Sequence, residues 1–132
     1  MMSMAHEPSV DELMFFDGKM MAFDLYKTFS EKLFTYFPDT GIKVQKTQIS
    51  FTNPKIFSCI SFTKVRKAKE RPREYIVVTL GLNRQVHSAR IDVATEPYPG
   101  RWTHHILIEH ADEIDDELME WVREAYHFAR VK

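Results

Sequence analysis

The sequence predicts an α+β fold, in which N-terminal and C-terminal helices pack on one face of an antiparallel sheet of four to five strands. Apolar residues recur with a helical period of 3.6 in residues 19–37 and 112–132, and with a period near 2 between them. Clusters of proline, glycine and asparagine divide that middle part into short strands. We therefore expect one domain over residues 9–132, preceded by a disordered lead at residues 1–8.

Start and stop signals bound the N-terminal helices. Ser9 and Glu12 have the spacing of a capping box, in which each side chain satisfies a free amide of the first turn. Asp17 and Gly18 form a turn signal that ends this first helix. A second helix is expected from Lys19 to Phe37. Its apolar stripe consists of Ala22, Leu25, Tyr26, Phe29, Leu33, Tyr36 and Phe37.

The C-terminal helix is expected to begin at the cap residue Asp112. Negative charge fills the first turns through Glu117, where the helix dipole favours it. A calcium loop would need a glycine that this acidic run lacks, so the run predicts no metal. The apolar stripe of the helix consists of Ile114, Leu118, Trp121, Val122, Ala125, Phe128 and Ala129.

The middle of the chain is expected to form antiparallel strands. In residues 42–52 the apolar positions change parity between Val44 and Ile49, which indicates either a bulge or two short strands. Apolar runs and alternating patterns predict the other strands. These lie at residues 56–65, 74–82, 86–95 and 101–109. The predicted order is two helices, five strands and one helix.

Composition excludes several classes of protein. The formal net charge of −1 supplies no overall field that attracts nucleic acid or an anionic membrane. Cys59 is the only cysteine, so no internal disulfide can form, and a reducing, cytoplasmic location is expected. The longest apolar runs fall well short of the ~18–20 residues that cross a bilayer. We therefore expect no membrane partner.

The richest polar chemistry lies in residues 97–105, beside a predicted strand. Two prolines stiffen the turn that delivers Arg101 to the start of this strand. Strand alternation places Thr103 and His105 on one face. That face, turned away from the helices, is expected to bind a small anion or a protein partner. The candidate ligand-binding residues are Lys46, Gln48, Arg90, Arg101, Thr103 and His105.

Arg101 has two interpretations. Its guanidinium, next to His105 and Lys46, would make a site for a carboxylate or a phosphate. Alternatively, it forms an ion pair with Glu96, Glu109 or a helix carboxylate. The sequence leaves both open.

A basic run, expected at the tip of a hairpin, could offer contacts to a nucleic-acid backbone. The run has no aromatic residue on which a base could stack, and the whole chain is slightly acidic. We therefore favour a solvated loop and do not expect nucleic acid as a partner. The cations of the run are Lys64, Arg66, Lys67, Lys69, Arg71 and Arg73.

Catalytic and metal-binding motifs are scarce. The glycines are isolated, so no glycine-rich phosphate loop is present. Cys59 and His105 could act as a nucleophile pair only if the fold makes them neighbours across strands. His104 and His105 point to opposite faces of one strand, so they cannot bind one metal by themselves. We predict no catalytic residue, no metal site and no cofactor.

Four short stretches resemble a family of bacterial domains of unknown function. They are KTQISF at 46–51, IFSCI at 56–60, GRWTH at 100–104 and ELMEWVREAY at 117–126. The resemblance spans roughly residues 13–129. Members of this family are loosely described as transport-related, and the family is distantly similar to the iron-chaperone-like superfamily. The resemblance implies a small antiparallel sheet packed by helices, with no established activity and no catalytic residue to carry over.

These observations favour a non-enzymatic binding module for a small ligand or a protein. A small enzyme that uses His105 and Cys59 is one alternative. A nucleic-acid accessory domain that uses the basic hairpin at residues 64–73 is another. A homodimer is also left open.

Overall fold

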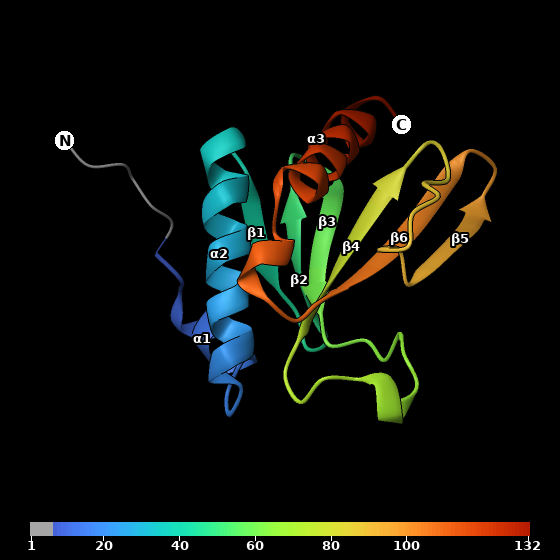
Figure 1. Cartoon of the computed structure of the whole chain (residues 1–132). Helices are drawn as coiled ribbons and strands as arrows, with labels where there is room; N and C mark the ends of the chain where they lie inside the picture. Colours follow the sequence, from blue (N-terminus) through green and yellow to red (C-terminus); the bar gives the residue numbers. More distant parts are fainter. Residues whose placement is uncertain (1–6) are drawn as a thin grey trace.

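Figure 1 shows the computed structural model, which describes residues 7–132. Residues 1–6 of the expected lead lie outside the described part of the chain. The helices are α1 (Val10–Phe15), α2 (Met20–Tyr36) and α3 (Asp116–Val131). The strands are β1 (Gly41–Val44), β2 (Gln48–Thr52), β3 (Ile56–Ser61), β4 (Ile76–Leu82), β5 (Val93–Tyr98) and β6 (Arg101–Ile108). Short 3₁₀ turns lie at η1 (Ala68–Glu70) and η2 (Ala111–Glu113).

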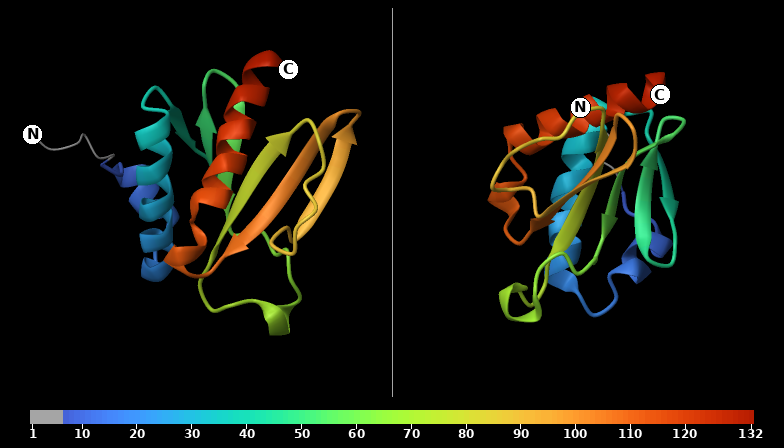
Figure 2. Two further views of the ribbon diagram at one scale, coloured as in Figure 1. Left: turned by 45° about the horizontal axis from the view of Figure 1, so that its top comes forward. Right: turned by 90° about the vertical axis from the view of Figure 1, so that its right-hand side faces the viewer.

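The strands form one antiparallel sheet in the order β1-β2-β3-β4-β6-β5. The α+β prediction is therefore confirmed, with the N-terminal and C-terminal helices packed against the sheet (Figure 2). The sheet has six strands, more than the expected four to five, because residues 42–52 belong to two strands of one hairpin. Residues 42–52 therefore form two short strands and not one strand with a bulge.

The face toward α2 and α3 is apolar. Ile49, Ile60, Val78 and Ile106 are partners in one row across β2, β3, β4 and β6, and each is at most 1% exposed. A one-residue slip of any strand would turn its apolar side chains to the other face, so this row holds the register. The buried helix residues that complete the core include Tyr26, Phe29 and Leu33 of α2 and Leu118, Val122 and Ala125 of α3. Tyr36, expected in the stripe of α2, is 48% exposed at the helix end.

The strand predicted at residues 86–95 is wrong in its first part, because the chain is irregular up to Asp92. The Val86 N–H donates to His104 Nε2 at 2.9 Å instead of to a strand carbonyl. The Asp92 carboxylate accepts the Leu107 N–H at 2.7 Å, so a side chain fills the place of a strand carbonyl. The alternation of apolar residues reflects local packing there and does not mark a ladder.

Helix α3 begins later than predicted. Asp112 lies in η2, and Asp115 is the N-cap, whose carboxylate accepts the Leu118 N–H at 3.0 Å. The carboxylate of Glu113 accepts two backbone N–H groups that precede η2, at 2.7 and 2.8 Å. The acidic residues therefore serve backbone amides and the helix dipole, as the sequence predicts, but around a different cap.

Gly100 turns the chain between β5 and β6 with a φ of 74°, in the left-handed region. We expect Gly100→Ala to lower the free energy of unfolding by about 1 kcal/mol, because an L side chain is strained in this conformation. Urea denaturation measures the loss. Gly81→Ala in β4 is the control, because an added Cβ meets no heavy atom within 4 Å there and the backbone is extended. Equal losses in the two variants would contradict the argument.

Candidate functional site

The face of the sheet away from α2 and α3, which we call the open face, carries a row of polar side chains. Strand register aligns one residue from each of β1, β2, β3, β4 and β6. The members of this polar row are Lys43, Ser50, Cys59, Thr79 and His105. The row crosses the sheet beside the buried apolar row but on its opposite side.

Hydrogen bonds join the polar row in two groups. Gln48 Nε2 donates to Ser50 Oγ at 2.8 Å and to Cys59 Sγ at 3.2 Å. Thr79 Oγ1 and His105 Nδ1 lie 2.9 Å apart. Ser50 and Cys59 are buried, whereas Thr79 and His105 are only half-buried. The second group is therefore the one that a ligand can reach more readily.

Burial keeps both Cys59 and His105 neutral near pH 7. It raises the pKa of the Cys59 thiol, against an opposing hydrogen bond from Ser50, and it lowers the pKa of His105. Thr79 of β4 stands between the two residues, which are therefore two strand spacings or about 10 Å apart. The fold does not form the Cys59–His105 nucleophile pair considered from the sequence.

Lys132 lines a small pocket of about 210 Å³ on the open face, and two further cations lie near Lys132. Lys55 Nζ donates to the Lys132 carbonyl oxygen at 2.5 Å. Burial, and then the charges of Arg101 and Lys55, lower the pKa of Lys132. We call Lys55, Arg101 and Lys132 the cation rim. Thr79 and Thr103 line the same pocket as Lys132, so hydroxyl groups and one of these cations share it.

Three of the predicted site residues lie on the open face. Thr103 and His105 alternate with core residues along β6, as the sequence predicts. Gln48 is also there, but its amide is bound to Ser50 and Cys59. Thr103 alone of these three lines the pocket beside the cation rim.

Arg101 and Lys46 do not converge, contrary to the sequence prediction. The row that contains Gln48 meets β6 at Leu107, six residues from Arg101, or roughly 20 Å along the strand. Lys46 lies beyond that row, in the turn between β1 and β2. Arg101 is exposed, and within residues 7–132 no ion pair joins it to a carboxylate. The Glu96 carboxylate accepts the Gly100 N–H instead, at 3.0 Å.

Arg90 is not part of the open face either. Its guanidinium donates to Asp115 at 2.8 Å and Glu117 at 3.0 Å, and to the Glu113 carbonyl oxygen at 2.5 Å. It also lies 5.8 Å from the ring centroid of Trp121. Strand parity misplaced Arg90 because this part of the chain is not a strand. Its role is to fasten the irregular segment to the start of α3.

Sequence reasoning missed Thr79, Lys55 and Lys132. Thr79 is a polar residue inside an apolar strand, which is a signal that could have marked it. Lys55 sits in a turn and Lys132 follows α3, where a cation is expected for the helix dipole alone. Only the packing of α3 across the sheet brings these two lysines together.

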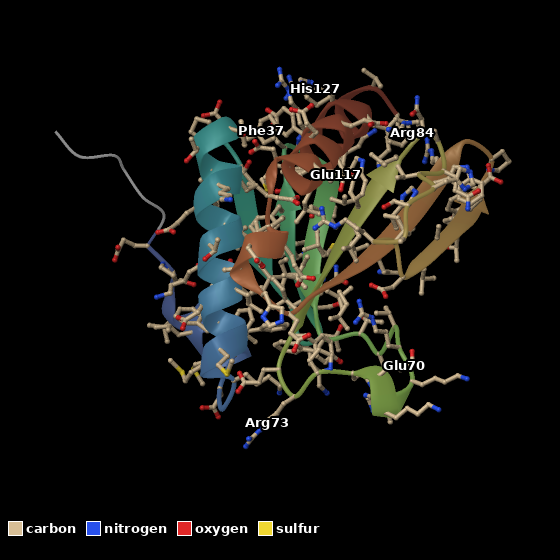
Figure 3. The ribbon with its side chains drawn as sticks, in the orientation of Figure 1. Phe37, Glu70, Arg73, Arg84, Glu117 and His127 are labelled. Atoms are coloured by element: carbon tan, nitrogen blue, oxygen red, sulfur yellow. The ribbon has the colours of Figure 1, made fainter. Side chains whose placement is uncertain are left out.

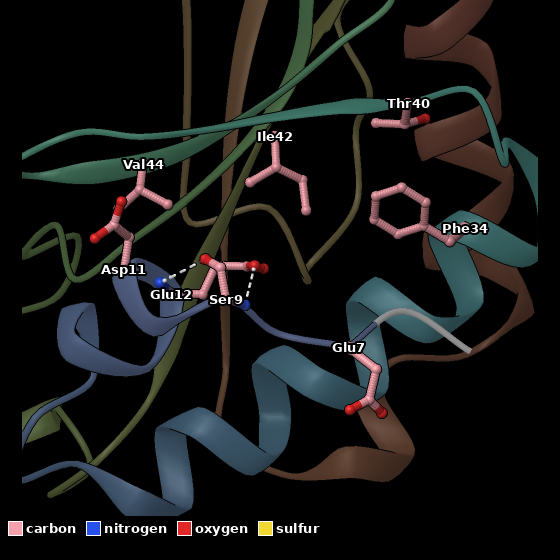
Figure 4. A pocket seen from close by; sticks show the side chains of 8 residues that line it. All are labelled: Glu7, Ser9, Asp11, Glu12, Phe34, Thr40, Ile42 and Val44. Atoms are coloured by element: carbon pink, nitrogen blue, oxygen red, sulfur yellow. Dashed lines mark hydrogen bonds between the residues drawn. The ribbon is translucent and has the colours of Figure 1, made fainter. Parts of the chain in front are cut away.

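A second pocket, of about 410 Å³, lies between the N-terminal segment and β1 (Figure 4). Its acidic side chains are Glu7, Asp11 and Glu12, and Ile42 and Val44 of β1 form part of an apolar wall. Acidic residues alone do not define a ligand. The contacts of Glu12, which is buried, show what this pocket does.

Glu12 has a structural role in this pocket. The Ser9 N–H donates to its carboxylate at 2.8 Å, and its own N–H donates to Ser9 Oγ at 3.2 Å, which confirms the capping box. Its other carboxylate oxygen accepts the hydroxyl of Tyr26 in α2. Burial, together with this contact, raises the pKa of Tyr26. The Glu12 carboxylate therefore ties α1 to α2.

Within residues 7–132, no three His, Cys, Asp or Glu side chains gather closely enough to hold a metal ion. No helix in that range combines the length and the apolar character that a membrane span requires. His104 and His105 point to opposite faces of β6, as predicted.

His104 is fully buried on the core side of the sheet. Its Nε2 accepts the Val86 N–H, so the hydrogen-bond network places the ring proton on Nδ1, next to the backbone of Leu80. Nδ1 has no hydrogen-bond partner of good geometry among the described residues. Burial lowers the pKa of His104, so the neutral ring is the one that holds Val86 and its irregular segment in place.

Comparison with known proteins identifies a family but no function. A family model described as a domain of unknown function (DUF5655) matches residues 14–129, nearly the whole described chain. Searches among curated proteins and among solved structures each find no match. The expected resemblance to a domain of unknown function is confirmed. The transport and iron-chaperone relations find no support in these comparisons.

The neutral state of His104 predicts a loss of stability in acid. The pKa of His104 is lower in the folded chain than the unfolded value near 6.5, so the unfolded chain binds more protons below roughly pH 6.5. The free energy of unfolding should therefore fall as the pH drops from 7.5 to 5.0. His104→Gln keeps an acceptor near the Val86 N–H without titrating, and should show a shallower fall. Urea denaturation across this pH range measures both slopes, and equal slopes would contradict the assignment.

Proposed function

The chain belongs to the family of the domain of unknown function DUF5655, and we propose that it is a non-enzymatic binding module whose cation rim holds a small anion. The observation that carries the proposal is that Lys132 lines this pocket while Lys55 and Arg101 lie close enough to Lys132 to act on its charge. Among the described residues, none of these cations forms an ion pair with a carboxylate side chain. The charges of Arg101 and Lys55 act unfavourably on that of Lys132, and an anion bound beside Lys132 would relieve this repulsion.

The pocket chemistry favours a carboxylate or a phosphate group. The planar guanidinium of Arg101 can donate two parallel hydrogen bonds to either group, and Lys132 adds a compact charge. Thr79 and Thr103 supply hydroxyl groups within the pocket. The volume of about 210 Å³ is smaller than the roughly 300–1,000 Å³ of pockets for drug-sized ligands. A small organic acid or phosphate ester fits this description.

Other interpretations stay predictions. A partner protein could present the carboxylate, and a second copy of the chain is one such partner. The transport and iron-chaperone relations come from the sequence resemblance alone. An enzyme built on Cys59 and His105 has the least support, because Thr79 separates the two side chains and burial keeps the thiol protonated.

Removal of one rim cation tests the anion site. We expect citrate or phosphate, at ten times its dissociation constant, to raise the melting temperature of the wild-type protein by about 4 °C. Arg101→Ala should abolish this rise. It should also leave the melting temperature without anion nearly unchanged, because Arg101 is exposed and forms no ion pair within residues 7–132. Differential scanning fluorimetry measures both quantities.

Arg123→Ala is the matched control, because Arg123 is an exposed arginine of α3 whose partner is Glu120. This variant should keep the full stabilisation by anions. If no small anion stabilises the wild-type protein, the anion site is wrong. If Arg101→Ala lowers the melting temperature by several degrees without anion, the role of Arg101 is structural.

The non-enzymatic part of the proposal has its own test. We expect no hydrolysis of generic ester, phosphoester or peptide substrates above background, measured with chromogenic substrates. Cys59 is buried with a raised pKa, so little thiolate is present to attack a substrate. A turnover that disappears in Cys59→Ala or His105→Ala would favour the enzyme.

A further inference from the structure

A groove of about 400 Å³ is lined by residues of the α1–α2 corner, the β1–β2 turn and the segment after β3. Figure 1 shows these segments at the lower end of the molecule, away from the C-terminus. We propose that this groove binds a nucleotide unit, meaning an aromatic base joined to a phosphate. Its lining residues are Phe15, Lys19, Lys46, Thr47, Phe62 and Thr63, and we call it the aromatic–lysine groove.

Phe15 and Phe62 supply the aromatic wall. Their rings are stacked, with centroids 5.1 Å apart and planes 18° from parallel. Phe16 packs edge-on against Phe62 at 5.5 Å, and the Tyr75 hydroxyl donates to the Phe62 carbonyl oxygen at 3.0 Å. Both rings of the wall are half-buried, so the stack is held in place but remains reachable. Any of the nucleic-acid bases can extend such a stack, because every base has an aromatic face.

Lys19 and Lys46 supply the positive charge. Lys19 Nζ lies 4.8 Å from the ring centroid of Phe62, so charge and aromatic surface are adjacent. Both lysines are exposed, and within residues 7–132 neither forms an ion pair with a carboxylate. A phosphate can therefore meet an ammonium group while its base contacts the rings. Thr47 and Thr63 add hydroxyl groups beside them.

Exposed cations continue from the groove along the segment between β3 and β4. Lys64, Lys67 and Lys69 are exposed there, and within the described residues none has a carboxylate partner. Figure 3 shows this segment, with Glu70 and Arg73 labelled, extending below the sheet. The ion pair of Arg66 with Asp92, at 2.7 Å, anchors the segment to the sheet.

This arrangement changes one part of the sequence argument against nucleic acid. That argument depended on the lack of an aromatic residue between Lys64 and Arg73 and on the slightly acidic balance of the whole chain. The fold brings Phe15 and Phe62 to the start of this segment. An acidic peptide would use the lysines and leave the rings unused, whereas a nucleotide uses both.

Calorimetric titration of the full chain with AMP and with ribose 5-phosphate tests the proposal. We expect AMP to bind about 10-fold more tightly or better, because only AMP carries a base. Lys19→Gln/Lys46→Gln should weaken AMP binding by about 10-fold or more, since two phosphate contacts are lost. Arg123→Gln/Arg130→Gln removes the same charge from exposed positions of α3 and should leave AMP binding unchanged.

A second variant separates the rings from the charges. Phe15→Leu keeps an apolar side chain and removes one ring, so it should weaken AMP binding and leave ribose 5-phosphate binding unchanged. Because the cation rim could itself bind the phosphate of AMP or of ribose 5-phosphate, each titration is repeated in an Arg101→Ala background. The preference for AMP, and its loss in the Lys19→Gln/Lys46→Gln and Phe15→Leu variants, should persist there. The nucleotide site and the anion site can therefore fail independently.

A labelled (dT)10 strand distinguishes the two sources of such a ligand. If a single strand is the ligand, (dT)10 binds more tightly than TMP. Its affinity then falls with salt with a logarithmic slope of roughly −3.5, as expected for five lysines. Equal affinity for TMP and (dT)10 assigns a free nucleotide.

Three results would overturn the proposal. One is equal affinity for AMP and ribose 5-phosphate. Another is binding of (Glu)10 as tightly as (dT)10, which would show recognition of charge alone. The third is the absence of binding of AMP and (dT)10 at millimolar concentration.

Discussion

The β5 edge of the sheet depends on the contacts of the Asp92 carboxylate. It accepts the Leu107 N–H at 2.7 Å and forms an ion pair with Arg66 at 2.7 Å, while the Asp92 N–H donates to the His105 carbonyl oxygen at 2.9 Å. The Asp92 side chain is only 13% exposed, and charged hydrogen bonds are strong where water is scarce. One residue thus starts β5 beside β6 and fastens the basic segment that begins at Lys64.

The two faces of the sheet differ in polarity. The row through Ile60 and Val78 packs under the helices and holds the register. The row through Cys59 and Thr79 places polar groups on the other face, because side chains alternate along each strand. His104 is a buried polar residue on the core side, where its neutral ring replaces a strand carbonyl as the partner of Val86. Polar chemistry inside the core therefore serves the fold, and polar chemistry on the open face is available to a ligand.

The net charge of −1 is the sum of charges that are unevenly distributed over the molecule. The cation rim lies at one end of the sheet, and the aromatic–lysine groove lies at the other. Carboxylates such as Asp115 and Glu12 are bound to backbone amides or to neighbouring side chains. The cations at the two ends have no carboxylate side chain as a partner within residues 7–132, although the chain as a whole is nearly neutral. The overall charge argued against nucleic acid and an anionic membrane, whereas our two proposals depend on this local arrangement.

The sequence by itself determined the α+β class, the helices, the capping box at Ser9 and most strands, because these follow from the local period of apolar residues and from turn chemistry. It also determined that Thr103 and His105 share a face. Tertiary structure alone decided that Arg90 binds the N-cap residue of α3, that the charge of Arg101 acts on Lys132, and where Lys46 lies. These placements depend on register, on an irregular segment held by side chains, and on how α3 crosses the sheet. Such contacts join residues that are distant in sequence, so a local sequence pattern cannot predict them.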